Sequence, residues 1–548
     1  MTIADAVGRA VAALGCRQAF GVVGSGNFVV TRALVESGAG FVAARHETAA
    51  VTMADAWARV TGEVGVATVH QGPGFTNALT GLAEAAKSRT PLVVLAGDTS
   101  AAAVRSNFRV DQAAMAAAVG AVPERVHTPA TALADVTRAF RRAALERRAV
   151  ALMLPLDVQA TADSVASAPP PGPPPVTRTR PAPEAVAAAA DLLADARRPA
   201  IVAGRGAVLA RARRPLEDLA DLTGALLATS ALGNGLFARN PYALGISGGF
   251  ASPVAAELLR DADLVLAAGA SLNMWTTRHG GLIGPAARVV QIDCDVDAIG
   301  AHRPVDLGIV GDVAETAAEL ATTLRARGHA GIGYRSPEVA GRIAAGAWRR
   351  QPYEDAGSGD RIDPRTLSIE LDRILPRERL LAIDSGHFMG WPAMYIDVPD
   401  PQGFVFTQAF QSIGLGLASA IGAAVARPDR LTVAALGDGG ALMAAGEIET
   451  VGRLGLPMLV VVYNDAAYGA EVHHFGPAGE PLDIVTFPDT DIAALGRAAG
   501  TEGVTVRRVD DLAAVERWIA DRRRPMVVDA KVEPTVVAEW LSEAFRAH

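Results

Sequence analysis

The sequence of 548 residues is 50% apolar and 20% charged, the profile of a globular protein of about three or four domains. A net charge of −8 gives no basic surface for nucleic acid, and Cys16 and Cys294 are too few for a disulfide framework or a cysteine metal site. The first residues have a helical period rather than the pattern of a signal peptide, and no apolar run reaches the ~20 residues of a membrane helix. We therefore expect a cytoplasmic protein without a nucleic-acid or membrane partner.

Short apolar runs alternate with helical segments along three stretches of the chain, residues 1–162, 184–330 and 360–548. Such alternation predicts the α/β class, with parallel sheets flanked by helices. The stretches are joined by a proline-rich segment, residues 163–183, which favours a semi-rigid linker, and by a Gly- and Arg-rich segment, residues 331–359. The sequence thus predicts three α/β domains and two linkers.

In the first stretch, polar residues follow three predicted strands, residues 18–23, 40–43 and 64–69. The segments at these strand ends are Gly24-Ser25-Gly26-Asn27, His46-Glu47 and His70-Gln71-Gly72-Pro73-Gly74-Phe75-Thr76-Asn77. Taken alone, Glu47 is an ordinary first-turn charge of the next helix. His70 is either a strand-end histidine bonded to a backbone carbonyl or a group that transfers protons near neutral pH.

The second stretch has predicted strands over residues 200–203, 264–268 and 289–292. Gly204-Arg205-Gly206 and Asp293-Cys294-Asp295 follow two of them, as in dinucleotide-binding units. No full G-x-G-x-x-G follows a strand, however, so nucleotide binding is a minor alternative.

The third stretch contains a predicted βαβ unit. A strand over residues 431–436 ends at Gly437-Asp438-Gly439-Gly440, a helix follows over residues 441–454, and a strand over residues 457–463 ends at Asn464. Asp438 and Asn464 are thus expected at the carboxyl ends of two parallel strands, the edge where open α/β sheets bind ligands. A carboxylate, an amide oxygen and free backbone amides suit a Mg²⁺ ion bridging to a diphosphate, although Gly-Asp-Gly by itself is also an ordinary turn.

Gly437-Asp438-Gly439 followed by a strand-ending Asn464 resembles the thiamine diphosphate (ThDP) motif, and with Glu47 the chain resembles the pyruvate decarboxylase and acetolactate synthase superfamily. The resemblance implies three doubly wound domains: a pyrimidine-binding domain, a Rossmann-like central domain and a diphosphate-binding domain. It implies that Asp438, Asn464 and the main-chain oxygen of Ala466 hold Mg²⁺. It also implies that Glu47 hydrogen-bonds N1′ of the aminopyrimidine, which lets N4′ take the proton from C2 of the thiazolium.

Further contacts are implied by the same resemblance. The other residues expected to touch the cofactor are Gly72, Pro73, Asn77, His387, Ile413, Gly437, Gly439, Gly440 and Tyr468. Ile413, on a helix predicted over residues 407–424, falls where the family has the apolar residue that bends the cofactor, an orientation effect. The Gly72–Asn77 loop is typical of the acetolactate-synthase-like branch.

The resemblance also suggests groups that face the substrate. His70 falls where benzoylformate decarboxylase carries a catalytic histidine, and Ser25 and Gly26 lie in a loop like the one with that enzyme's substrate-binding serine. The remaining candidates are Glu471 and His473 as acid or base, and Trp275, His279 and His474 as substrate contacts. A last helix, expected over residues 534–548, carries Trp540, Leu541 and Phe545 on one side, either to pack against the body or to form a lid.

The reaction implied is C–C bond cleavage and formation on 2-oxo acids, in which decarboxylation is followed by release of an aldehyde or addition to a second carbonyl. Because the family builds each site from the N-terminal domain of one subunit and the C-terminal domain of its partner, we expect at least a homodimer, and usually a homotetramer. Alternatives are a benzaldehyde lyase-type enzyme, a 2-hydroxyacyl-CoA lyase-type enzyme with ADP in the central domain, and a non-catalytic regulatory protein. FAD is not favoured, because residues 271–278 do not form a convincing FAD loop.

Overall fold

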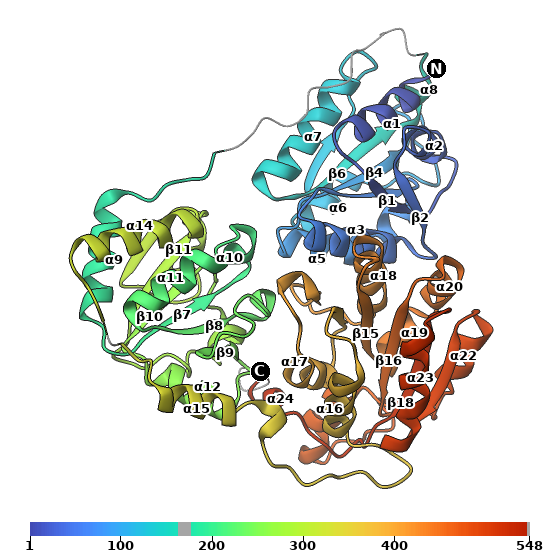
Figure 1. The fold of residues 1–548 in the computed structure, drawn as a ribbon. Coiled ribbons are helices and arrows are strands. Elements are labelled where there is room, and N and C mark those ends of the chain that lie inside the picture. The colour runs from blue at the N-terminus through green and yellow to red at the C-terminus, as the bar shows by residue number, and fades with distance from the viewer. Residues whose placement is uncertain (163–176, 332, 545–548) are drawn as a thin grey trace.

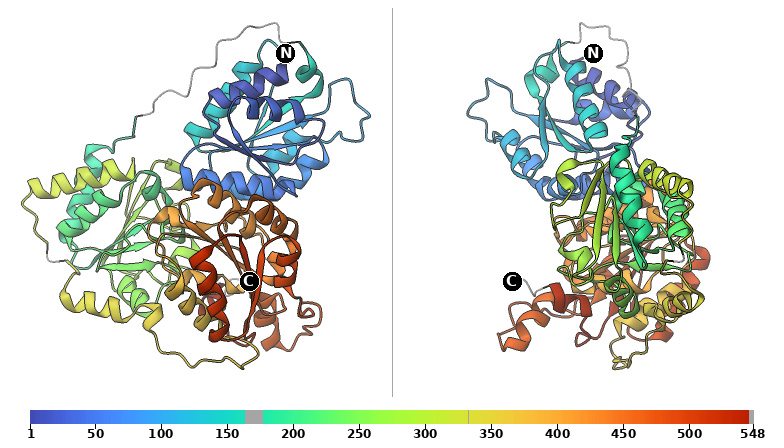
Figure 2. Two further views of the ribbon diagram at one scale, coloured as in Figure 1. Left: turned by 45° about the vertical axis from the view of Figure 1, so that its right-hand side comes forward. Right: turned by 90° about the vertical axis from the view of Figure 1, so that its left-hand side faces the viewer.

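The computed structural model describes residues 1–162, 177–331 and 333–544, and it contains three α/β units, each built on one six-stranded sheet (Figures 1 and 2). All strand pairings in these sheets are parallel, which confirms the predicted α/β class. No described helix is long and apolar enough to cross a membrane. Residues 163–176 of the proline-rich segment and Phe545 lie outside the described residues.

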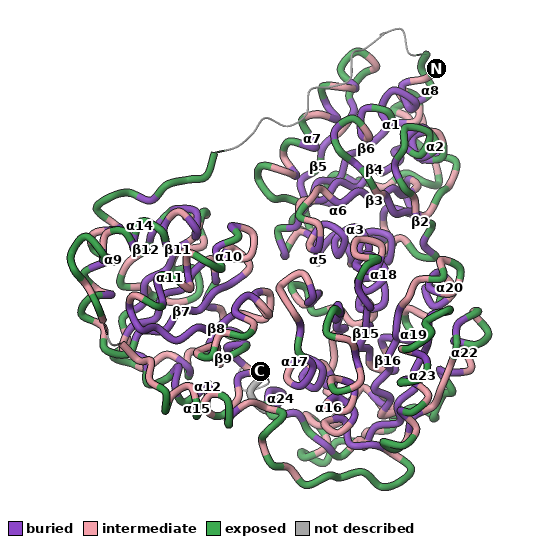
Figure 3. The backbone as a smooth tube through the Cα atoms, viewed as in Figure 1, coloured by how far each residue is buried: buried purple, intermediate pink, exposed green. Residues whose placement is uncertain are grey.

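The N-terminal unit has the strand order β2-β1-β3-β4-β6-β5. Its strands are β1 (Gln18–Gly21), β2 (Gly40–Ala43), β3 (Gly65–Val69), β4 (Leu92–Asp98), β5 (Val122–Arg125) and β6 (Ala149–Pro155). Its helices are α1 (Ile3–Ala13), α2 (Phe28–Glu36), α3 (Glu47–Thr61), α4 (Pro73–Asn77), α5 (Leu79–Lys87), α6 (Gln112–Ala118), α7 (Ala132–Glu146) and α8 (Leu156–Ala160). Helices cover both faces of the sheet, so β3, β4 and β6 are buried along their whole length (Figure 3).

The central unit has the strand order β12-β11-β10-β7-β8-β9, which reverses between β7 and β10 as in dinucleotide-binding sheets. Its strands are β7 (Pro199–Ala203), β8 (Leu226–Thr229), β9 (Ala243–Ile246), β10 (Leu264–Ala268), β11 (Arg288–Asp293) and β12 (Leu307–Val310). Its helices are α9 (Pro183–Asp195), α10 (Arg205–Leu209), α11 (Arg213–Thr223), α12 (Pro253–Arg260), α13 (Met274–Thr277), α14 (Val313–Ala326) and α15 (Pro337–Ala345). Residues 331–359, predicted as a linker, contain α15, whose Val339 and Ile343 pack against the core of this unit.

The C-terminal unit has the strand order β14-β13-β15-β16-β18-β17. Its strands are β13 (Arg379–Ile383), β14 (Phe404–Phe406), β15 (Leu431–Gly437), β16 (Met458–Asn464), β17 (Glu502–Val506) and β18 (Met526–Lys531). Its helices are α16 (Pro364–Ile374), α17 (Gly390–Tyr395), α18 (Gly416–Ala426), α19 (Asp438–Met443), α20 (Ala445–Leu454), α21 (Gly469–Phe475), α22 (Ile492–Ala498), α23 (Ala513–Asp521) and α24 (Glu539–Ala544).

The N-terminal and C-terminal units share one topology, although no repeat is visible in the sequence. With strands counted from the start of each unit, both orders read 2-1-3-4-6-5. Both orders reverse between the first and third strands, and ligands of open α/β sheets bind beside the carboxyl ends of strands at such a point. The helices α3 and α18 each follow the second strand of their unit and are therefore equivalent.

These equivalent helices pack against each other and join the two units (Figure 1). A Cβ atom at Gly422 of α18 would lie only 2.1 Å from the main-chain oxygen of Met53 in α3, so the two backbones are in direct contact. One apolar core contains residues of both helices and of both sheets, for example Met53 and Ile421. The two units are therefore held together by continuous packing.

Two predicted helices have different limits in the structure. Residues 407–415 form a loop and α18 begins only at Gly416, because Gln411 and Gly414 have left-handed φ angles of +61° and +86° that a helix does not allow. The helix predicted over residues 441–454 is two helices, α19 and α20, divided at Ala444.

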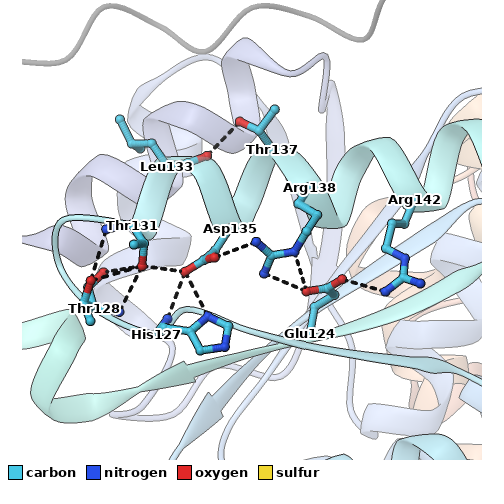
Figure 4. Close-up of polar contacts among 9 residues, drawn as sticks. All are labelled: Glu124, His127, Thr128, Thr131, Leu133, Asp135, Thr137, Arg138 and Arg142. Carbon is cyan, nitrogen blue, oxygen red and sulfur yellow. Dashed lines mark hydrogen bonds and ion pairs between the residues drawn. The ribbon is translucent and has the colours of Figure 1, made fainter.

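The edge strand β5 is tied to α7 by a polar network (Figure 4). Glu124 of β5 accepts hydrogen bonds from Arg138 at 2.8 Å and from Arg142 at 2.9 Å. Asp135 of α7 accepts from Arg138 at 2.7 Å and from the main-chain N–H of His127 at 2.9 Å. Burial alone would raise the pKa of Glu124, but the two arginines hold it below its usual value.

Substituting Gly422 tests the α3–α18 contact. In Gly422→Ala the added methyl group meets the backbone of α3, which no rotamer change can relieve, so we expect the free energy of unfolding to fall by about 1–3 kcal/mol. Gly341→Ala in α15 is the matched control: no atom lies within 4 Å of its added Cβ, and helix propensity favours Ala there by about 1 kcal/mol. Urea unfolding followed by circular dichroism measures both. A Gly422→Ala protein as stable as the control would contradict direct backbone contact.

Candidate functional site

The first part of the candidate site lies where β15 and β16 end. Asp438 is the first residue of α19, directly after β15, and Asn464 is the last residue of β16. The two strands are hydrogen-bonded neighbours, with Gly437 in register with Tyr463. Asp438 and Asn464 therefore lie at the same edge of the sheet, at the strand ends where the sequence placed them.

Asp438 lies beside a second carboxylate, Asp465. Burial and the neighbouring Asp465 raise the pKa of Asp438 to about 8, and burial raises the pKa of Asp465 to about 6. Two carboxylates in contact, here the buried Asp438 and the half-buried Asp465, are unfavourable unless a proton or a cation lies between them. No group of three or more His, Cys, Asp or Glu that could hold a metal occurs in the described part of the chain. The chemistry therefore fits Mg²⁺ held by one or two carboxylates with amide, carbonyl and phosphate oxygens.

The side chain of Asn464 is held in one orientation. Its Nδ2 donates to Asp529 Oδ1 at 2.9 Å, and its Oδ1 accepts from the N–H of Ala466 at 3.1 Å. Asp529 is paired at 2.9 Å with Lys531, whose side chain is 3% exposed. The main-chain oxygen of Ala466, the third expected metal ligand, accepts from the N–H of Phe487 at 2.8 Å, and a carbonyl oxygen keeps a second lone pair.

The glycines around Asp438 are required by close approach. A Cβ atom would lie 2.7 Å from the ring of Tyr468 at Gly439, and 2.2 Å from Asp384 Oδ2 at Gly440. Neither these two residues nor Gly437 has a left-handed φ, so backbone conformation does not account for glycine at these positions. The small residues leave the main chain open toward a ligand, which fits a diphosphate.

The buried carboxylate of Asp384 organises the loop that carries Ile413. It accepts hydrogen bonds from the N–H groups of Gly414 at 2.9 Å, Leu415 at 3.2 Å and Gly416 at 3.1 Å. Burial raises the pKa of Asp384 to about 6 against the opposing effect of these bonds. In the loop that Asp384 holds in this way, Ile413 is half-buried and lines the cavity described below.

His387 is a neutral histidine with a defined tautomer. Its Nε2 accepts from the N–H of Ala538 at 3.0 Å, so its proton is on Nδ1, which faces the start of α21 near Gly469. Burial and the ring of His473, 4.4 Å away, lower the pKa of His387 to about 3. His387 can therefore donate one hydrogen bond without carrying a charge.

A cavity of about 1340 Å³ lies mainly between the C-terminal and central units, and four residues of the N-terminal unit also line it, namely Arg59, Lys87, Ser88 and Arg89. Several predicted residues line it, namely His387, Ile413, Asp438 with its neighbouring glycines, Tyr468, Glu471, Trp275 and His279. Trp540 and Leu541 of α24 also line it; they are 8% and 3% exposed, so this helix packs against the body. His473 and His474 do not line the cavity.

A second cluster lies at the strand ends of the N-terminal unit. Glu47, the first residue of α3, accepts a hydrogen bond from Asn77 Nδ2 at 3.1 Å. His70 and Glu47 lie on either side of Gly74, where an added Cβ would be 3.0 Å from His70 Cβ and 3.4 Å from Glu47 Oε1. His70 Nδ1 donates to the carbonyl of Gln71 at 2.9 Å. In the neutral ring, Nε2 is then the nitrogen that carries no proton.

The unprotonated nitrogen of His70 can accept a proton. Ser25 Oγ lies 3.3 Å from this Nε2, which brings together the two residues that the sequence analysis paired as substrate contacts. Gly26 is buried beside Gln71, whose Oε1 an added Cβ would contact at 1.7 Å. Gly72 has a φ of +66° and Pro73 begins α4, which together make the tight turn after β3.

The two clusters are separate within one chain, because Ser25, Glu47, His70 and Asn77 do not line the cavity.

Sequence reasoning missed two residues, Asp465 and Glu447. Asp465 is adjacent to Asn464, and a second acidic residue at a strand end was a usable signal. Glu447 contacts the segment before Glu47, a contact between residues far apart in the sequence that no local pattern reveals.

Comparison with known proteins agrees with this arrangement. Residues 1–118, 186–320 and 384–530 match the N-terminal TPP binding, central and C-terminal TPP binding domains of thiamine pyrophosphate enzymes. The chain therefore belongs to the thiamine pyrophosphate (ThDP) enzyme family, in its acetolactate-synthase-like branch.

The curated relatives include sulfoacetaldehyde acetyltransferases and acetolactate synthases. Sulfoacetaldehyde acetyltransferases of Castellaniella defragrans and Alcaligenes xylosoxydans are each 30% identical, over 96% and 93% of this chain and 92% and 89% of their own. The acetolactate synthase large subunit of Parasynechococcus marenigrum is 29% identical over 84% of this chain and 76% of its own.

Substitution of Asp384 tests whether the loop of residues 407–415 helps to position the cofactor. In Asp384→Ala the buried N–H groups of residues 414–416 lose their acceptor, at a cost of about 1–3 kcal/mol for each group left unsatisfied. We expect a lower free energy of unfolding, faster proteolysis within residues 407–415, and ThDP binding in the presence of Mg²⁺ weakened at least tenfold in calorimetry. Asp384→Asn, which keeps one acceptor oxygen, should lie between wild type and Asp384→Ala. Unchanged ThDP affinity in Asp384→Ala would show that this loop does not position the cofactor.

Proposed function

We propose that this protein is a ThDP- and Mg²⁺-dependent enzyme that cleaves or forms C–C bonds of 2-oxo acids, by decarboxylation followed by carboligation or aldehyde release. The observation that carries the proposal is the contact between two carboxylates, the buried Asp438 and the half-buried Asp465, beside the oriented amide of Asn464. Arg361 lowers the pKa of Asp465 only in part, whereas a divalent cation would stabilise both carboxylates. The metal ligands proposed are Asp438, Asn464 and the main-chain oxygen of Ala466.

Residues of the N-terminal cluster would activate the cofactor and handle protons. When bound, ThDP supplies a carbon nucleophile that adds to a carbonyl group and accepts the electrons released by decarboxylation. Glu47 would hold a proton against the aminopyrimidine, with Asn77 fixing the orientation of its carboxylate. His70 would accept or return a proton at Nε2, and Ser25 would orient the substrate there.

The separation of the two clusters supports a site shared between two subunits. Exposed apolar side chains flank both clusters. Met443, near Asp438, is 57% exposed, and Phe108 is 44% exposed with its ring 5.2 Å from the ring of His70. Apolar surface next to an incomplete site favours burial against a second copy. We therefore propose a homodimer as the smallest active form and a homotetramer as its usual assembly.

A second candidate reaction is acetyl transfer from sulfoacetaldehyde. The relatives named sulfoacetaldehyde acetyltransferase are similar over more than nine-tenths of this chain, which favours including their named substrate in the test.

FAD is not part of the proposal. At the switch point of the central sheet, Gly206 N donates to Gly269 O at 3.0 Å, and the Arg205 guanidinium bonds to Ser88 and Thr90 of the N-terminal unit.

Turnover of 2-oxo acids tests the proposal. We expect the protein with ThDP and Mg²⁺ to release carbon dioxide from at least one 2-oxo acid, in a panel run with and without aldehyde acceptors and extended to sulfoacetaldehyde. Glu47→Gln should lower kcat about 100-fold or more, as expected for loss of a group that moves protons. Glu63→Gln, near the other end of α3, is the control and should leave kcat unchanged.

Several outcomes would count against this assignment. Full turnover in Glu47→Gln would remove Glu47 from the mechanism. Calorimetry that detects no ThDP binding in the presence of Mg²⁺ would favour a non-catalytic regulatory protein. Turnover of an acyl-CoA, or nucleotide that co-purifies with the protein, would instead favour the 2-hydroxyacyl-CoA lyase type.

A further inference from the structure

The backbone just before Glu47 is held by a helix of the C-terminal unit. Glu447 of α20 accepts hydrogen bonds at Oε1 from the N–H groups of Arg45 at 2.8 Å and His46 at 3.0 Å. Arg453 of the same helix donates to the main-chain oxygen of Ala43 at 2.6 Å. The whole connection from β2 to α3 therefore takes its position from α20.

Glu447 is built into this place. It is 2% exposed, and its Oε2 accepts from Thr450 Oγ1 at 2.7 Å. A buried carboxylate is tolerated only where hydrogen bonds replace its water shell, and here two of the three donors are backbone groups of another unit. Glu449, its neighbour on the solvent side, pairs with the side chains of Arg45 and Arg453.

An equivalent clamp holds the other unit. Glu84 of α5, 0% exposed, accepts from the N–H groups of Ala409 at 3.2 Å and Phe410 at 2.7 Å. Arg59 donates to the main-chain oxygen of Phe406 at 3.0 Å. The helices α5 and α20 both follow the third strand of their unit, and both clamped segments follow the second strand. Each unit thus fixes the strand-to-helix connection of the other through a buried glutamate on equivalent helices and an arginine, although Arg59 lies on α3 and Arg453 lies on α20 itself.

We propose that Glu447 is the positioning residue that sets the place of Glu47. It acts through the backbone of Arg45 and His46, because His46 is the N-cap of α3 and Glu47 is the first residue of that helix. Displacing a group by about 1 Å from its working geometry can cost 100-fold in rate. The role of Glu47 itself rests on the function proposed above.

The same contact connects two active sites. Glu447 follows Asp438 on the paired helices α19 and α20, so the segment that would hold the diphosphate also holds the connection before Glu47. In the proposed dimer, Asp438 and Glu47 of one chain serve different sites. Each site is then positioned partly by the chain segment that binds cofactor in the other.

Amide exchange of the protein without cofactor tests the clamp independently of activity. We expect Glu447→Ala to speed hydrogen–deuterium exchange at the amides of Arg45 and His46 at least tenfold, because both lose a buried acceptor. Glu449→Ala, the matched control, should change these rates less than twofold. Unchanged exchange in Glu447→Ala would overturn the clamp, whatever the enzyme's reaction is.

A double-mutant cycle tests the route through Glu47. We expect Glu447→Ala to lower kcat at least tenfold in the wild-type protein but less than twofold in Glu47→Gln, because the displaced group is already absent there. Glu447→Gln should restore most of the turnover, since its amide oxygen still accepts from both N–H groups. An equal loss in both backgrounds would overturn the proposal, because it would mean that Glu447 acts on stability or elsewhere.

A shorter side chain covers the case in which Glu447→Ala does not fold. Glu447→Asp keeps the charge but withdraws the carboxylate by one methylene, so we expect a smaller loss of kcat with the same dependence on Glu47. Wild-type kcat in Glu447→Asp together with wild-type exchange at Arg45 and His46 would overturn the positioning role. Full activity in Glu47→Gln alone would instead refute the proposed function and leave the clamp to be decided by the exchange data.

Discussion

Backbone packing between α3 and α18 fixes how the two units that carry the candidate site are arranged. The contact at Gly422 and Met53 leaves no room for a side chain, so the two helices have one possible separation. Because they follow equivalent strands, this separation also brings each strand-to-helix connection against the opposite unit. The buried carboxylates of Glu84 and Glu447 can then reach backbone N–H groups across the contact. The clamps depend on this packing, since a small shift between the helices would break several hydrogen bonds at once.

The shared topology explains why chemical groups gather at corresponding places in the two units. The first and third strands of each sheet end in polar loops at the point where the strand order reverses. In the C-terminal unit this edge opens into the cavity, with Asp438 at its wall. In the N-terminal unit the same edge carries Glu47 and His70, which lie away from that cavity. One chain therefore presents two separate polar clusters, which is the arrangement that the proposed dimer would bring together.

Most of the fold and much of the site were predictable from the sequence, because they depend on local patterns. Each apolar run predicted as a strand is one in the structure, to within about two residues. The positions of Asp438 and Asn464 followed from strand ends alone. The loop before α18 was predicted as helix because its residues are small and apolar, whereas Asp384, far away in sequence, captures its N–H groups. The clamp by Glu447 was invisible for the same reason: its partners are residues that no periodicity connects to it.

The pKa values of four carboxylates in this chain depend on the groups that surround each of them. Burial alone would raise the pKa of Glu84, but Arg59 and backbone N–H groups lower it, so Glu84 stays ionised as a structural link. Asp384 accepts only backbone N–H groups, and burial prevails to raise its pKa to about 6. Asp438, beside Asp465, is raised furthest, to about 8. A carboxylate with an arginine or several N–H donors is satisfied by the protein itself. In the Asp438–Asp465 pair two carboxylates lie together and both pKa values stay raised, although Asp465 accepts the N–H of Ala467 and lies near Arg361. Perturbed pairs of this kind are candidates for a ligand site rather than a structural contact.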